Sequence, residues 1–186
     1  MPFVIEFDWF EEDEEDDLSQ AERVFLAHLR GRASAWPCEP QDTQLVEPVD
    51  GRPHWRAVLD VCAGMELGNL GLITVGVCFD GTSIRGSEVH SQSFSTYPDE
   101  WSRVEVVEAT GPPEGLAEIA ADWFERILAR PVERREWWSS DGLTYDYVFS
   151  DTGTGLVCGG VAGLERFRRP PDRVIHARGE STHAAD

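Results

Sequence analysis

The spacing of apolar residues along the chain predicts two amphipathic helices. Apolar side chains recur every three or four positions over residues 18–30 and, on a wider face, over residues 114–129. Ser19 and Glu22 fit a capping box at the start of the first segment, and Pro131 stops the second. Each helix therefore has one apolar side to bury against another element.

Strand-like patterns lie between and after these helices. Residues 55–62 alternate between apolar and polar, as in a strand with one face in the core, and residues 70–79 are apolar on both faces, as in a central strand. Asp80 and Gly81 predict a tight hairpin turn into a return strand at residues 82–85. Further strands are expected at residues 101–108, 132–138, 143–149 and 156–158.

The order of the elements predicts an α+β fold. Strands that follow one another through short turns pair antiparallel, so we expect a mainly antiparallel sheet of about five to seven strands with the two helices packed on one face. Residues 32–53, with four prolines, are expected to form a loop. A chain of 186 residues suits one core, which we place in residues 1–164, followed by a basic, flexible tail at residues 165–186.

Charge is distributed unevenly along the chain. The formal net charge is −19, from 35 acids and 16 bases, and every base is Arg. Residues 1–22 hold ten acids and no base, and residues 11–17 read EEDEEDD. Such charge repels phosphate backbones and anionic membranes and attracts cations. We therefore expect a cationic protein partner, no direct nucleic-acid binding and no membrane association.

Motifs for metals, cofactors and catalysis are weak. The four cysteines are widely spaced, the five histidines show no HxH or HxxxH spacing, and the glycines do not fit a phosphate loop, for which the chain also has no Lys. We expect no metal site, no cofactor and, on balance, no catalysis. No signal peptide or membrane-spanning stretch is recognisable, so the expected compartment is the cytoplasm. The use of Arg without Lys, with abundant Ala and Gly, indicates a GC-rich genome. We expect the source to be bacterial.

Aromatic residues mark two candidate contact regions. Trp137 and Trp138 are adjacent on a predicted strand, so one should lie in the core and the other on the surface, next to Arg135. Trp9 and Phe10 precede the acidic run, either at the end of an edge strand, which the alternation favours, or in a short acidic-hydrophobic docking motif. The expected partner-binding residues are Trp9, Phe10, Glu11, Glu12, Asp13, Glu14, Glu15, Asp16, Asp17, Arg135, Trp137 and Trp138.

A non-catalytic acidic binding protein is the favoured function. It would be an inhibitor or immunity-type protein, in which the acidic run steers a cationic protein partner and aromatic residues anchor it. The alternative is a small-molecule-binding or enzymatic α+β domain with a site between sheet and helix. The candidate residues of that alternative site are His54, Asp60, Glu88 and His90. Assembly into a homo-oligomer stays open.

Overall fold

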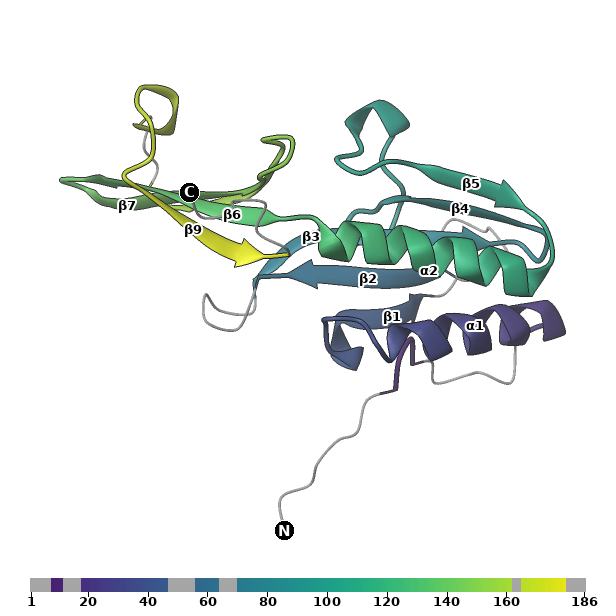
Figure 1. Cartoon of the computed structure of the whole chain (residues 1–186). Coiled ribbons are helices and arrows are strands. Elements are labelled where there is room, and N and C mark those ends of the chain that lie inside the picture. The colour runs from purple at the N-terminus through teal and green to yellow at the C-terminus, as the bar shows by residue number, and fades with distance from the viewer. Residues whose placement is uncertain (1–7, 12–17, 47–55, 64–69, 162–164, 180–186) are drawn as a thin grey trace, which may run out of the picture. The chain divides into compact units, whose positions relative to one another are not determined.

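The structure confirms the α+β class and divides the chain into two compact units. The computed structural model describes residues 8–11, 18–46, 56–63, 70–161 and 165–179 (Figure 1). These residues form two α-helices and two antiparallel sheets, one of five strands and one of four, in place of the single sheet expected from the sequence. Unit 1 comprises residues 1–61 and 74–128, and unit 2 comprises residues 62–73 and 129–186.

The five-stranded sheet lies mainly in unit 1, with the strand order β1-β2-β3-β4-β5. Its strands are β1 (Thr43–Val46), β2 (Arg56–Cys62), β3 (Gly71–Phe79), β4 (Ser83–Glu88) and β5 (Val107–Thr110). The expected hairpin turn joins β3 to β4, where Gly81 adopts a φ of 94° that side chains disfavour. Residues 32–53 were expected to form a loop, but four of them form β1. These four residues pair with β2 despite the surrounding prolines.

Both helices contact the face of this sheet that carries Val77 and Phe79. α1 (Gln20–Ala33) begins with the expected capping box, and its Phe25 ring stacks on the ring of Phe79 with centroids 4.5 Å apart. α2 (Pro113–Ala129) places Trp123 against Gly86, the residue of β4 that pairs with Val77. Figure 1 shows the two helices running beside the sheet.

A buried ion pair shapes the loop between β4 and β5. The Glu88 residue is only 2% exposed, and its carboxylate accepts hydrogen bonds from the backbone nitrogen and the Nε atom of Arg103, at 2.8 and 2.9 Å. This contact ties Arg103 to the end of β4, and the strand expected at residues 101–108 starts only at Val107. The preceding residues instead contain a short 3-10 turn, Asp99–Trp101.

Unit 2 is built around the four-stranded sheet, in the order β8-β7-β6-β9. Its strands are β6 (Val132–Ser139), β7 (Gly142–Phe149), β8 (Gly155–Gly160) and β9 (Arg173–Arg178). The first two form the expected hairpin, with Val132 paired to Phe149. Residues 165–179, expected to be a flexible tail, instead contain a 3-10 turn and β9, which pairs antiparallel with β6.

Candidate functional site

The acidic run is bounded on both sides by residues that are buried in unit 1. Phe10, just before it, is 0% exposed, and Leu18, just after it, is 5% exposed. Glu11, at the start of the run, is exposed, while residues 12–17 lie outside the described part of the chain. The run is therefore a connection between two fixed points, not the end of a free tail.

Phe10 is held by both its ring and its backbone. Its ring contacts the rings of Trp36 and Phe124, with centroids 6.1 and 6.2 Å away. The Arg30 guanidinium, on α1, donates hydrogen bonds to the carbonyl oxygens of Trp9 and Phe10, each at 2.8 Å. Phe10, expected to contact a partner, is thus part of the core, whereas Trp9 is half-buried against Trp36, with ring centroids 6.2 Å apart.

These contacts also fix where the run begins and ends relative to α1. Phe10 is bound by Arg30, close to the C-terminal end of the helix, whereas the run ends next to Ser19, the N-cap residue. At about 1.5 Å per residue, the helix rises roughly 15 Å between its N-terminus and Arg30. Phe10 and Leu18, the described residues on either side of the run, therefore lie near opposite ends of α1. Most of the edge strand favoured by the sequence falls on residues 1–7, which lie outside the described residues, and residues 8–11 contain a turn at Trp9 and Phe10.

Most of the protein's negative charge belongs to unit 1. This unit has 25 acids and eight Arg, a formal charge of −17, whereas unit 2 has ten acids and eight Arg, a formal charge of −2.

Three carboxylates of α2 surround Arg32 of α1 and raise the pKa of its guanidinium. They belong to Glu118, Asp122 and Glu125, whose side chains are 49%, 57% and 38% exposed.

The two adjacent tryptophans of β6 lie as the strand geometry requires. Trp137 is 4% exposed, and its Nε1 atom donates a hydrogen bond to the carbonyl oxygen of Arg169 at 3.1 Å. Trp138 is 56% exposed and accepts a hydrogen bond from Arg169 through its own carbonyl oxygen. Its backbone nitrogen donates to the Asp172 carboxylate at 2.7 Å. Only Trp138 of this pair offers a large exposed ring.

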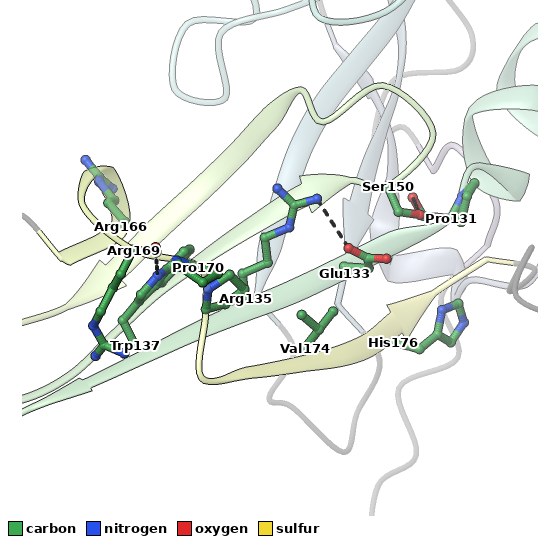
Figure 2. A pocket seen from close by; sticks show the side chains of 11 residues that line it. Pro131, Glu133, Arg135, Trp137, Ser150, Arg166, Arg169, Pro170, Val174 and His176 are labelled. Carbon is green, nitrogen blue, oxygen red and sulfur yellow. Dashed lines mark hydrogen bonds and ion pairs between the residues drawn. The ribbon is translucent and has the colours of Figure 1, made fainter.

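A groove of about 710 Å³ lies on the face of the four-stranded sheet that carries Arg135 and Trp137 (Figure 2). Alternate residues of β6 and β9 form its floor, and the segment before β9 forms its wall. The lining residues are Pro131, Glu133, Arg135, Trp137, Ser150, Arg166, Arg169, Pro170, Pro171, Val174 and His176. This site was hardly visible from the sequence, because the net basic charge of residues 165–178 led us to expect a flexible tail there and not a groove wall followed by an edge strand.

The described residues of the alternative small-molecule or catalytic site each contact other residues of the protein. Burial raises the pKa of Asp60, whose carboxylate accepts a hydrogen bond from the Thr74 hydroxyl at 2.6 Å. The carboxylate of Glu88 binds Arg103, and His90 is exposed beside Tyr97, with ring centroids 5.9 Å apart. His54 lies outside the described residues.

Within the described ranges, no cluster of three or more His, Cys, Asp or Glu side chains is arranged to hold a metal ion. No helix in the described part of the chain is long and apolar enough to cross a membrane. No protein-family model, curated protein or solved structure matches the chain.

Proposed function

We propose that this chain is an acidic, non-catalytic binding protein that neutralises a cationic protein, as an inhibitor or immunity-type protein does in the bacterial cytoplasm. The observation that carries the proposal is the fixing of the acidic run at both ends, by Phe10 and Leu18. The seven consecutive carboxylates thus follow directly on one anchored residue and are followed directly by another. A partner that binds them does not have to order a segment attached at one end only.

Electrostatics give this surface its role in recognition. Exposed charges act over about 8–10 Å at physiological salt, so the run attracts a basic surface mainly during encounter. Charge complementarity of this kind raises the association rate and orients the partner. The 18 remaining acids of unit 1 add to the same field, since they outnumber the eight Arg of that unit about twofold.

Anchoring the run at two points lowers the entropic cost of binding. Ordering a flexible segment on association opposes affinity, and a segment attached at both ends has less freedom to lose. Trp9 is only partly buried beside the run and supplies an aromatic contact at its border. Phe10 contributes indirectly, because it fastens the segment to the core.

The charge also excludes the commonest anionic partners. A surface with a formal charge of −17 repels nucleic-acid phosphates and anionic lipid headgroups. A basic protein, including one that itself binds nucleic acid, is the partner that this charge complements.

The test is affinity capture from native lysate with three full-length chains. The first is unchanged, the second carries E12Q, D13N, E14Q and E15Q, and the third carries E100Q, E105Q, E114Q and D141N. The last four residues are exposed acids outside the run in the sequence, and both variants lose the same charge. Deleting residues 1–17 is a poor test, because it also removes Phe10 from the core.

The proposal predicts that the unchanged chain and the third chain recover the same cationic protein, and that the second chain recovers much less of it. Recovery should also fall as salt is added. Equal recovery by the second and third chains would show that the run is not the interface. Recovery of no cationic protein by any of the chains would contradict the proposed function itself.

A further inference from the structure

The groove on the four-stranded sheet has the dimensions and construction of a small-molecule site. Its volume of about 710 Å³ falls within the roughly 300–1,000 Å³ typical of ligand sites. Side chains from alternating positions converge there: Glu133 and Arg135 project from β6, and Val174 and His176 project from the opposing positions of β9. All of its lining residues belong to unit 2.

The wall of the groove is fastened to the floor by several hydrogen bonds. The Trp137 indole donates to the Arg169 carbonyl oxygen at 3.1 Å, and the Asp172 backbone nitrogen donates to the Glu136 carbonyl oxygen at 2.8 Å. The Arg166 guanidinium donates to the Asp146 carboxylate on β7 at 2.9 Å. A cavity held open in this way is preorganised, which lowers the cost of binding a ligand.

Cations predominate among the charged side chains of the lining. Three Arg residues face one carboxylate, that of Glu133. Two of these Arg already form ion pairs within the protein, since Arg166 binds Asp146 and Arg169 binds Asp172. A lining with this balance favours a negatively charged ligand.

Arg135 is the cation best placed to bind such a ligand. Its partner is Glu133, two residues away on the same strand, and their closest N–O distance is 3.4 Å, longer than the 2.9 Å between Arg166 and Asp146. The Arg135 side chain is 34% exposed and the Glu133 side chain 16%. Figure 2 shows the Arg135 guanidinium reaching over the floor toward Glu133. A carboxylate or phosphate offers Arg two oxygens and a shorter, charge-assisted contact.

Apolar surface lies beside this cation. Val174 is 51% exposed although it lies in the groove, opposite Arg135 on β9. Pro170 and Pro171 also line the groove. Removing this apolar surface from water is favourable, so a ligand whose apolar body covers it binds more tightly.

We propose that this groove binds a small organic anion, with its carboxylate or phosphate group at Arg135 and its apolar body against Val174 and Pro170. The proposal goes beyond the binding of a cationic protein and is independent of it, because it concerns unit 2 and a ligand of opposite charge. In the empty groove the Glu133 carboxylate pairs with Arg135, and it competes with the anionic ligand for this guanidinium.

The test is an NMR titration of the full-length protein with probes that share one ring and differ in charge. Benzoate, benzamide and benzamidine carry −1, 0 and +1, and phenyl phosphate distinguishes a preference for phosphate over carboxylate. We expect benzoate or phenyl phosphate to shift the backbone amides of β6 and β9 and to bind more tightly than benzamide. Benzamidine should bind most weakly.

Three variants separate ligand binding from a structural role. R135Q should weaken binding of the anionic probe by about tenfold or more, in line with the loss of a charged hydrogen bond. R168Q is the matched control, because Arg168 is exposed and does not line the groove. E133Q should strengthen binding, since it removes the competing carboxylate, and a structural role alone does not predict that gain. Melting temperatures of all three variants verify folding.

The proposal is overturned if benzamide binds as tightly as both anions, or if R135Q and R168Q weaken binding equally. It is also overturned if benzamidine binds most tightly, which would make Glu133 the centre of a cation site, or if no probe shifts the groove amides. None of these outcomes affects the proposed cationic protein partner, which is tested by substituting the acidic run of unit 1.

Discussion

The backbone nitrogen of Phe10 donates a hydrogen bond to the Oγ1 atom of Thr43, 2.9 Å away and 33 residues later in the chain. Thr43 begins β1, so this contact ties the N-terminal segment to the edge of the five-stranded sheet. Together with the buried Phe10 ring, it makes the start of the acidic run part of the folded unit. The account of function depends on this attachment.

Replacing Phe10 with Ala should destabilise the protein by about 3–5 kcal/mol, the usual cost of removing a large aromatic side chain from a core. The free energy of unfolding in urea measures this effect. W9A is the control and should cost clearly less, because Trp9 is only partly buried. A loss below about 1 kcal/mol for F10A would mean that the segment is not packed in the core, since core truncations cost more.

The ion pair between Glu88 and Arg103 should matter more than an exposed pair on the same sheet. R103A leaves the buried Glu88 carboxylate without its guanidinium partner, which should cost about 3 kcal/mol. R85A removes a cation whose partners, Asp99 and Glu108, have side chains 57% and 65% exposed, and should cost under about 1 kcal/mol. Equal losses in urea unfolding would contradict the special role of the buried pair.

Two glycine substitutions should have opposite effects on the stability of the fold. A Cβ atom at Gly86 would lie 2.7 Å from the Val107 side chain and 3.3 Å from Trp123, so G86A should destabilise by about 1–3 kcal/mol. At Gly31, in α1, an added Cβ would meet no atom within 4 Å apart from its chain neighbours and the helix's own backbone, so G31A should stabilise by up to about 1 kcal/mol. Thermal unfolding distinguishes the two, and a neutral G86A would contradict the close packing of α2 on β4.

Acid should weaken the turn between β3 and β4. Hydrogen bonds from the Ser83 side chain and the Thr82 backbone lower the pKa of Asp80 from 3.8 to about 2. Because the folded pKa is lowered, the stabilisation is present above pH 3.8 and is lost as the pH falls toward 2. D80N should therefore flatten this part of the stability–pH curve, whereas D141N, at an exposed position, should leave its slope unchanged.

Local patterns predicted the elements of the fold well. The capping box of Ser19 and Glu22, the turn at Asp80 and Gly81 and the β6–β7 hairpin depend on neighbours in the sequence, and the structure confirms all three. Long-range contacts were less visible. The division into two sheets and the pairing of β9 with β6 depend on residues about 40 positions apart.

At the candidate site, too, local patterns predicted part of the arrangement and long-range contacts decided the rest. Alternation on one strand predicted that Trp137 and Trp138 would differ in exposure, but it did not show which would be buried. The choice depends on Arg169 and Asp172, which pack against the strand from the C-terminal segment. The composition near Phe10 suggested a surface contact, and only the tertiary fold reveals the pocket formed by Trp36 and Phe124.

The most direct test of the central claim is the association rate of the captured partner, measured by stopped-flow at several salt concentrations. We compare the unchanged chain, the chain with E12Q, D13N, E14Q and E15Q, and the charge-matched chain with E100Q, E105Q, E114Q and D141N. Substituting the run should slow association by about tenfold or more at low salt and flatten the salt dependence, with a much smaller change in the matched chain. Association rates that fall equally in both variants, or that do not depend on salt, would contradict the claim that the anchored acidic run steers a cationic partner.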